Sequence, residues 1–345
     1  MTPKDPNTSD FVPRLADVAD RAGVSTATVS RCLNSPEQVQ KKTRDKVMKA
    51  VTELGYSPNF SAQSLAAKRT NTIGAIIPTM DNAIFARGIQ AVQEELGRAG
   101  ATLLVASSSY RPALEADQIR ALVARGADGL LLIGHQRDSQ IYEFLDRQQV
   151  PVVVSWAYDP DKPKPSIGFD NRAAMRAMAA EVLAQGHRRI AVITARQADN
   201  DRARDRVAGI RDAMENAGLD HSRLPVFETH YAIEAGSAAL ASLITSSPAP
   251  TAVICGNDVL AVGALLAAQS LGVRVPHDLS ITGFDDIELA TVTSPALTTV
   301  HVPHRKMGVL AARQLWQMVT DGGSGDSLRL DTELKLRGTL GPPSN

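Results

Sequence analysis

The chain has 345 residues, of which 43% are hydrophobic, and its 37 basic residues are balanced by 37 acidic ones. This length indicates two or three domains, and the zero net charge excludes a protein that is basic throughout. Only two cysteines are present, and their positions do not match a zinc-ligand spacing. The sequence also contains no run of about 18 apolar residues. We therefore expect no disulfide framework, no metal, no cofactor and no membrane span.

Residues 1–13 are polar and proline-rich and lack the apolar core of a signal peptide. We expect them to be a disordered lead-in and the protein to be cytoplasmic, where thiols stay reduced. Residues 11–69 hold ten basic and five acidic side chains, a local charge of +5, so the rest of the chain carries −5. A small basic module on a mildly acidic body is typical of a protein that binds an anionic polymer at one end.

Two short helices are predicted in the stretch LADVADRAGVSTATVSRCL, residues 15–33. Apolar residues recur with helical spacing over 15–22, and Gly23 ends this first helix because glycine enters the left-handed region at little cost. Ser25 can cap a second helix, whose Val29 and Leu33 point back at the first. Its other face carries small or polar residues, namely Thr26, Ala27, Ser30 and Arg31. The pattern indicates a helix-turn-helix, although an ordinary helical hairpin has the same features.

A third helix is predicted from Lys41 to Leu54, ending at Gly55. Its outward face is basic and carries Lys41, Lys42, Arg44, Lys46 and Lys49. A solvated surface would have the same composition, but beside a helix-turn-helix we interpret this face as a phosphate contact. Residues 60–69 are short and alanine-rich, which predicts a linker or a marginal helix that folds only when docked.

From Asn71 onward, apolar strands alternate with helical stretches. The predicted strands are 73–77, 102–106, 129–133, 151–154, 189–194, 252–255 and 279–282. The predicted helices include 83–99, 115–125, 171–185, 202–217, 234–245 and 258–271. Continuous apolar strands with helices between them indicate parallel sheets covered on both faces. Because about 275 residues exceed what one such sheet needs, we predict two lobes facing a cleft, with crossings near 166–170 and 298–303.

The ordered series of motifs resembles the LacI/GalR family of bacterial transcriptional repressors over nearly the whole chain. The matching stretches are LADVADRAGVSTATVSRCLN, TRDKV, LGYSPN, TNTIG, ICGND, GFDD and PALTTV. The resemblance implies an N-terminal all-α helix-turn-helix domain (14–59), a hinge helix or linker (60–70) and a periplasmic-binding-protein-like α/β core of two doubly wound parallel-sheet lobes (71–345). Within the family, IPTMDNAIFA, SYRPALE and SIGFDN look most similar to repressors of gluconate utilisation.

The resemblance places the second helix in the major groove of DNA. Arg31 is then positioned to pair with a guanine edge, although a phosphate contact or an internal salt bridge remains an alternative. Leu65 matches a leucine that wedges into the minor groove, the alternative being packing between linker and core. Phe60 departs from the basic or polar residue common at its position. The complete set of expected DNA contacts is Ser25, Thr26, Ala27, Thr28, Ser30, Arg31, Asn34, Asn59, Ala62 and Leu65.

A small-molecule effector is expected beyond the carboxyl ends of the strands, where ligands sit in parallel sheets. The resemblance assigns ligand contacts to Phe85, Arg206, Asn257 and Asp285, with Arg206 holding a carboxylate and Asp285 accepting sugar hydroxyls. Tyr110 and Asp170 follow strands and are further candidates for lining the cleft. Each position also has a plainer interpretation: Arg206 as an exposed charge, Asp286 as a turn residue and Asp258 as a helix cap.

We therefore predict a homodimeric repressor that reads a near-palindromic double-stranded operator under control of a sugar or sugar acid such as gluconate. The alternatives are an enzyme on the same fold, for which no Walker loop, nucleophile elbow or metal-binding motif is present, and a sugar-binding protein, which leaves residues 14–69 unexplained. The sign of the effector response is open because relatives include induced and co-repressed members.

Overall fold

The computed structural model describes residues 12–57, 69–81 and 83–344. Contacts divide the chain into two units, residues 1–70 and residues 71–345, each of which is described separately below. None of the helices in the described ranges is long and apolar enough to cross a bilayer.

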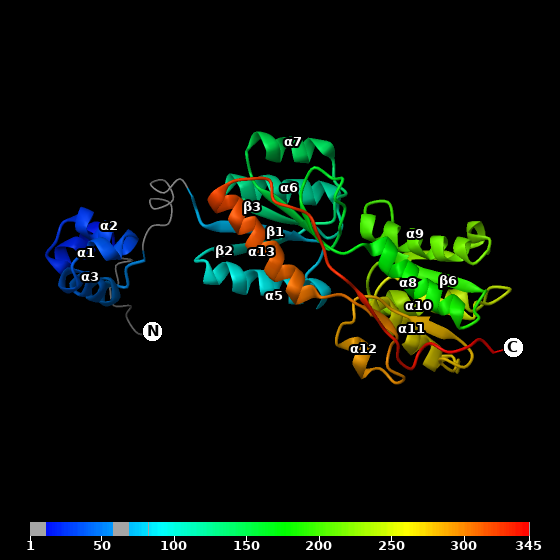
Figure 1. The fold of residues 1–345 in the computed structure, drawn as a ribbon. Helices are drawn as coiled ribbons and strands as arrows, with labels where there is room; N and C mark the ends of the chain where they lie inside the picture. Colours follow the sequence, from blue (N-terminus) through cyan, green and yellow to red (C-terminus); the bar gives the residue numbers. More distant parts are fainter. Residues whose placement is uncertain (1–11, 58–68, 82, 345) are drawn as a thin grey trace, which may run out of the picture. The chain divides into compact units, whose positions relative to one another are not determined.

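The first unit is helical over its described part, residues 12–57 (Figure 1). Its elements are α1 (Leu15–Ala22), α2 (Thr26–Asn34), the 3-10 turn η1 (Pro36–Gln38) and α3 (Lys41–Leu54). Gly23, at φ 66°, ends α1, and Gly55, at φ 62°, ends α3, because only glycine enters this left-handed region without a Cβ penalty. Val18, Val29 and Val47 are fully buried where the three helices meet. A helix-turn-helix core is therefore formed as predicted.

The second unit consists of two α/β lobes, and lobe 1 is built on a six-stranded sheet (Figure 1). The strand order is β2-β1-β3-β4-β5-β11, and β1 pairs with β2 in parallel from Thr72↔Thr102 to Ile77↔Ser107. The strands are β1 (Thr72–Ile77), β2 (Thr102–Ser107), β3 (Gly129–Ile133), β4 (Val152–Ser155), β5 (Ser166–Gly168) and β11 (Leu328–Arg329). The helices are α5 (Ala83–Arg98), α6 (Pro112–Ala124), α7 (Ser139–Arg147) and α13 (His304–Asp321).

Lobe 2 repeats this topology in a four-stranded parallel sheet of order β7-β6-β8-β9. The strands are β6 (Ile190–Ala195), β7 (Val226–Thr229), β8 (Ala252–Cys255) and β9 (Ser280–Thr282). The helices are α8 (Asn171–Ala184), α9 (Asp201–Asn216), α10 (Ile233–Leu243), α11 (Asp258–Ser270) and the short α12 (Leu289–Val292), with the 3-10 turn η2 (His221–Arg223). In both sheets the strand order reverses beside the first strand, which is where doubly wound folds bind ligands.

Each sheet is covered by helices on both faces, as its continuous apolar strands require. Side chains alternate along a strand, so Ile73 and Ala75 of β1 pack with α5 and α13, while Ile76 packs with α6 and α7. In lobe 2, Val192 faces α8 and α9, whereas Ile193 faces α10 and α11. The predicted two-lobed fold of doubly wound sheets is confirmed.

The chain crosses between the lobes three times: after β5, after β10 (Thr299–His301) and between β11 and β12 (Glu333–Lys335). β10 and β12 form a two-stranded antiparallel sheet, and both pack against α8 of lobe 2. The first two crossings follow the predicted regions, 166–170 and 298–303. The third was not predicted, because β11 and β12 are only two and three residues long.

Candidate nucleic-acid interface and ligand cleft

The outward face of α2 presents polar and small side chains to solvent. Thr26, Ala27, Arg31 and Asn34 are exposed, while Val29 and Cys32 on the opposite face are buried. Arg31 forms no ion pair with any residue in the described part of the chain, so its guanidinium is available to a ligand. Small and polar side chains on an exposed helix face are typical of a recognition helix, which enters the major groove with its first residues at the base edges.

The other predicted DNA contacts on α2 are engaged in local hydrogen bonds. The Ser25 hydroxyl accepts a hydrogen bond from the Thr28 backbone N–H at 3.2 Å and pairs with the Thr28 hydroxyl at 2.9 Å, which caps the helix as expected. The Asn34 amide donates to the Ser30 hydroxyl at 3.2 Å. These four side chains therefore stabilise α2 locally, and their contact with DNA remains a prediction.

The basic face of α3 is partly neutralised at its C-terminal end. Glu53 pairs with Arg21 of α1 at 2.7 Å and with Lys49 at 3.8 Å. Lys41, Lys42 and Lys46 are exposed toward the start of the helix, where a backbone phosphate can approach them. The remaining predicted DNA contacts, Asn59, Ala62 and Leu65, lie outside the described residues.

Strained backbone marks the cleft between the two lobes. The non-glycine residues with positive φ include four in the loops that follow strands: Tyr110 (55°) after β2, Trp156 (60°) after β4, and Asp285 (103°) and Asp286 (53°) after β9. Such conformations cost about 1–3 kcal/mol each and persist where the surrounding structure holds them, which is typical of ligand sites. All four residues lie at the carboxyl ends of parallel strands, where the sequence predicts ligand contacts.

Arg206 of α9 is the centre of a buried polar cluster. It is 4% exposed, which overturns the alternative of an exposed charge. Its Nε donates to the Asn171 side-chain oxygen at 2.9 Å, its Nη1 donates to the Gly256 carbonyl at 2.6 Å, and its Nη2 lies 3.7 Å from Asp285 Oδ1. The guanidinium also lies over the Phe284 ring, 3.8 Å from the centroid. Arg206 thus joins the loops after β8 and β9 to the start of α8.

Asp285 is fully buried, and neither of its carboxylate oxygens has a hydrogen-bond partner among the described residues. Burial raises the pKa of this carboxyl to about 7, although Arg206 acts in the opposite direction. Asn257, beside it after β8, is 1% exposed and uses its side-chain oxygen to cap α11, while its Nδ2 has no partner in the described chain. The structure therefore brings Arg206, Asn257 and Asp285 together, with unpaired polar atoms at the cleft.

Two further acidic residues near Asp285 have structural roles. Asp258 was predicted to be the cap of α11, but Asn257 is the cap, and the Asp258 carboxylate instead accepts hydrogen bonds from the Thr299 hydroxyl (2.5 Å) and the Ile287 N–H (2.8 Å). Burial raises the pKa of Asp258 to about 8. Asp286 accepts a hydrogen bond from the Arg337 guanidinium at 2.6 Å and pairs with His301 at 2.9 Å. It therefore connects the turn after β9 to the segment after β12.

Phe85 and Asp170 are placed less directly at the cleft. Phe85 is buried in the core of lobe 1, with its ring centroid 5.5 Å from that of Trp156. Asp170 is half-buried and caps α8 by accepting the Ala173 N–H at 2.8 Å. Packing and capping account for these two side chains, and their contact with a ligand remains a prediction.

The lobes are joined across the cleft by α9 and the loop after β3. Asp201 Oδ2 accepts the backbone N–H groups of His135 (2.5 Å) and Gln136 (3.1 Å), and Arg202 donates to the Ile133 carbonyl at 3.2 Å. Gly134 lies between them at φ 71°, a left-handed conformation that favours glycine, and a Cβ there would displace the side chains of Arg202 and Asp201 from these contacts. These contacts hold the two lobes together on one side of the cleft.

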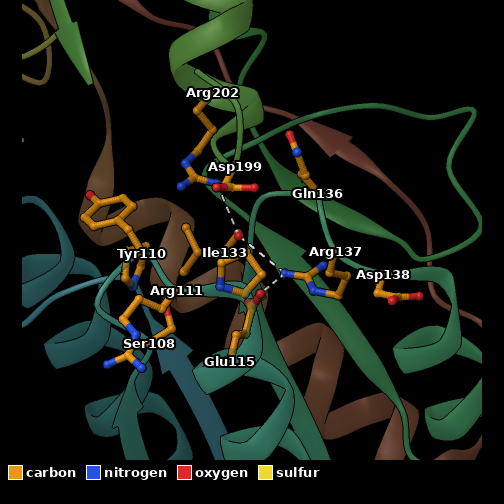
Figure 2. A pocket seen from close by; sticks show the side chains of 12 residues that line it. Ser108, Tyr110, Arg111, Glu115, Ile133, Gln136, Arg137, Asp138, Asp199 and Arg202 are labelled. Carbon is orange, nitrogen blue, oxygen red and sulfur yellow. Dashed lines mark hydrogen bonds and ion pairs between the residues drawn. The ribbon is translucent and has the colours of Figure 1, made fainter. Parts of the chain in front are cut away.

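A hollow of about 290 Å³ opens beside these contacts and is lined from both lobes (Figure 2). Figure 2 shows Arg202 reaching from α9 to the Ile133 carbonyl, while Arg137 and Glu115 meet on the opposite side. A second hollow, of about 270 Å³, has Tyr110 and Tyr231 in its lining, and the two rings pack against each other with centroids 5.7 Å apart. Tyr110 is in the lining of both hollows, and its contact with a ligand remains a prediction.

Sequence reasoning missed several residues of the cleft. Arg202 and Tyr231 line the two hollows. Asn171 hydrogen-bonds Arg206 and the Trp156 carbonyl, and the His304 ring stacks on that of Trp156. Each of these residues follows a strand or lies at the start of a helix. Position after a strand was thus the signal that could have found Trp156 and Tyr231. The contacts of Trp156 with Asn171 and His304, and of Tyr231 with Tyr110, join segments far apart in the sequence, which periodicity does not reveal.

Comparison with known proteins identifies both units. Residues 14–59 match the model described as bacterial regulatory proteins, lacI family, and residues 179–340 match the periplasmic binding protein-like domain. The transcriptional regulator DegA of Bacillus subtilis is 34% identical over 298 residues, covering 85% of this chain and 88% of DegA. The chain belongs to the LacI family. A second family member, the transcriptional repressor PurR of Vibrio atlanticus, is 33% identical over 310 residues, covering 89% and 92% of the two chains.

Solved structures of LacI family members share this fold over nearly the full length. The lac repressor dimer bound to operator and the anti-inducer ONPF superimposes with a TM-score of 0.85 at 27% identity, covering 96% of this chain and all of the other. The regulator CelR in complex with cellobiose gives a TM-score of 0.71 at 30% identity, covering 95% and 99%. The architecture of both units is therefore that of the family.

Proposed function

We propose that this LacI family member is a cytoplasmic, sequence-specific repressor that binds double-stranded DNA through α2 and answers to a small molecule in its cleft. The exposed face of α2, with Thr26 at its start and Arg31 one turn later, carries the DNA-binding part of the proposal. Arginine can donate to both acceptors of a guanine edge, which discriminates against other bases by about 1–3 kcal/mol. The protein acts by binding equilibria alone, without catalysis, metal or cofactor.

The DNA-bound form is a homodimer on a near-palindromic operator. A single helix-turn-helix makes few base contacts, so specific affinity needs two modules on two half-sites. The lac repressor, whose solved form is a dimer on operator, supports this assembly for a chain of the same fold. Whether dimers assemble further is a separate question that sedimentation of the full chain answers.

The effector site lies where Arg206, Asn257 and Asp285 meet, and the unpartnered carboxylate of Asp285 carries this part of the proposal. A hydroxyl-bearing ligand supplies the donors that Asp285 lacks, and cellobiose in CelR is a ligand of this class. The resemblance to repressors of gluconate utilisation makes a sugar or a sugar acid the preferred effector. Because Nη2 of Arg206 already faces the Asp285 carboxylate at 3.7 Å, a ligand carboxylate is better placed elsewhere in the cleft than on Arg206.

Coupling follows if the ligand changes the relative position of the lobes, which the contacts of Asp201 and Arg202 with lobe 1 help to set. Such coupling is typically worth about 1–3 kcal/mol in operator affinity. A rise in operator affinity with ligand identifies a co-repressor, and a fall identifies an inducer.

Selection from random double-stranded DNA with the full chain tests the proposal. We expect enrichment of a near-palindrome and loss of specific binding when residues 1–70 are deleted. Persistent specific binding by residues 71–345 would refute the assignment of DNA recognition to α2. In the same assay, the Asp285→Ala variant is expected to bind the operator as the wild type does, but adding the effector is expected to leave its operator affinity unchanged.

A further inference from the structure

Asp201, the first residue of α9, connects lobe 2 to the loop that follows β3 in lobe 1. Its Oδ2 accepts the backbone N–H groups of His135 at 2.5 Å and Gln136 at 3.1 Å. Its Oδ1 accepts a hydrogen bond at 2.9 Å from the Arg202 guanidinium, which also donates to the Ile133 carbonyl at 3.2 Å. Hydrogen bonds to a carboxylate are charge-assisted and stronger than neutral ones. We call these contacts of Asp201 and Arg202 with residues 133–136 the latch.

A side chain of lobe 1 reinforces the latch in the reverse direction. The Gln136 Nε2 donates to the Ala198 carbonyl at 2.6 Å, and its Oε1 accepts a hydrogen bond from the Arg204 guanidinium at 2.6 Å. Both polar atoms of one amide are therefore bonded to lobe 2. All of these bonds join groups of the chain itself, so they need no ligand atom to form.

The Asp201 carboxyl is ionised inside the latch, although the residue is only 8% exposed. Burial acts to raise the pKa of this carboxyl, but the Arg202 guanidinium and the backbone N–H groups of His135 and Gln136 outweigh burial and hold the pKa below its usual value. The latch therefore keeps its charge-assisted bonds at neutral pH.

The loop that Asp201 contacts is held in place within lobe 1. The side chain of Arg137 is 2% exposed, and its Nη2 donates to Glu115 Oε1 at 3.1 Å. The Tyr142 hydroxyl donates to the His135 carbonyl at 3.1 Å, and Asp138 caps α7. The two N–H groups that face Asp201 are thus positioned in advance, so little conformational freedom is lost when the carboxylate binds them.

Other contacts between the lobes are weaker than the latch. Arg87 of α5 donates from Nε to Glu288 Oε1 at 2.9 Å, but the Glu288 side chain is 68% exposed, and exposed ion pairs contribute little. The rings of Tyr110 and Tyr231 also meet across the lobes, through an apolar contact that fixes no hydrogen-bonding direction. The latch is therefore the contact expected to decide the spacing of the lobes.

We infer that Asp201 holds the two lobes at this spacing through the chain's own groups, without help from a ligand. This part of the inference does not depend on the proposed function. For the proposed repressor, on which the second part rests, the latch sets operator affinity before any effector binds. A ligand that widens the cleft must break the contacts of Asp201, whereas one that fits the latched cleft preserves them. Asp201 is thus a positioning residue, which acts through the lobes.

The first test measures the spacing of the lobes in the full chain by pulsed spin-label spectroscopy. Labels are placed on Arg147→Cys in α7 and Arg211→Cys in α9, which are both exposed positions, while the native Cys32 and Cys255 are buried. Dilution with unlabelled chain restricts the measurement to pairs within one chain. Asp201→Ala is expected to lengthen the distance by more than about 2 Å. An unchanged distance would overturn the inference.

Asp212→Ala is the matched control for Asp201→Ala. Asp212 is also on α9, but it pairs with Arg172 at 2.6 Å within lobe 2, so its loss is expected to leave the spacing of the lobes unchanged. Asp201→Asn retains an acceptor oxygen without the charge, and a smaller lengthening than in Asp201→Ala is expected. An equal lengthening in Asp212→Ala would show that loosening of α9, and not loss of the latch, separates the lobes.

A second pair of variants breaks the latch from lobe 1 and leaves Asp201 intact. A Cβ on Gly134, at φ 71°, would overlap the Arg202 guanidinium and lie 2.5 Å from Asp201 Oδ1, so these flexible side chains must move away. Gly100, at φ 76°, has no atom within 4 Å of its Cβ position, so Gly100→Ala introduces similar backbone strain without the overlap. We expect Gly134→Ala, but not Gly100→Ala, to lengthen the distance. The wild-type distance in Gly134→Ala would contradict the inference.

The effect on function is measured as ligand-free affinity for an operator selected from random DNA. Asp201→Ala and Gly134→Ala are expected to change this affinity in the same direction by about fivefold or more, and Asp212→Ala is expected to leave it unchanged. A changed spacing of the lobes with unchanged operator affinity would refute the regulatory part of the inference. If the wild type selects no operator, the proposed function is wrong, and the spin-label distances still decide whether Asp201 holds the lobes.

Discussion

Arg31 on the outward face of α2 has no ion-pair partner, and Asp285 and His304 beside the cleft have no side-chain hydrogen-bond partner, among the described residues, but their environments are opposite. Arg31 is exposed, so water satisfies its guanidinium at no cost to the fold. Asp285 and His304 are 0% and 3% exposed, and burial shifts their pKa values to about 7 and about 3. Residues of an exposed DNA-binding face can therefore be replaced with little effect on folding stability. Polar residues buried in a ligand site, by contrast, lower the stability of the ligand-free fold.

Replacing an arginine in each region gives the largest expected contrast. Arg206→Ala leaves Asp285 and Asn171 without their partner in the interior, which is expected to destabilise the second unit by about 3–5 kcal/mol. Arg31→Ala, on the exposed face, is expected to change stability by no more than about 0.5 kcal/mol. Urea unfolding of both variants measures this difference, and equal losses would contradict it.

The exposed arginine is expected to matter for recognition instead. Arg31→Ala is expected to lower operator affinity by about 1–3 kcal/mol and to relax base preference at one step of each half-site. Titrations against single-base operator variants at several salt concentrations give the measurement. A uniform loss over all sequences with a smaller salt slope would show that Arg31 contacts a phosphate.

The start of α2 gives a smaller effect that depends on one hydroxyl. Ser25→Ala removes the acceptor of the Thr28 N–H and is expected to destabilise the first unit by about 1 kcal/mol. Ser35→Ala is a matched control, because Ser35 donates no side-chain cap to the 3-10 turn that it precedes. Thermal unfolding followed by helical circular dichroism distinguishes the two variants, and similar losses would argue against the cap.

The smallest expected effect is the pH dependence of stability that the buried Asp285 carboxyl causes. Its folded pKa, about 7, exceeds that of an unfolded aspartate, so the folded state binds more protons and this residue destabilises it increasingly from about pH 4 to about pH 7. Asp285→Asn removes this dependence, and the variant is expected to gain stability relative to the wild type as pH rises. Unfolding temperatures at pH 5 and pH 8 give the result; a difference that shrinks with pH would contradict the assignment.

Much of the fold was predictable because its strands are continuous apolar runs. All seven predicted strands, such as 129–133, occur within about a residue of their predicted bounds. The missed strands β5, β7, β10, β11 and β12 have two to four residues, and β7, β11 and β12 are partly exposed rather than continuous buried apolar runs. Helix α13 was also missed, although Met307, Ala311 and Leu315 recur at helical spacing and are buried. Its core-facing pattern was present in the sequence.

The candidate sites also differ in how far a local sequence pattern predicts them. Residues 14–55 determined the helix-turn-helix by themselves, because glycine turns, a serine cap and helical spacing are local properties. The family resemblance supplied Arg206, Asn257 and Asp285. Only the tertiary structure decided that they are buried together and that the Asp285 carboxylate has no hydrogen-bond partner among the described residues. His304 lies beside both Trp156 and Asp285 because the chain crosses between the lobes, and contacts between segments so far apart leave no periodic signal in the sequence.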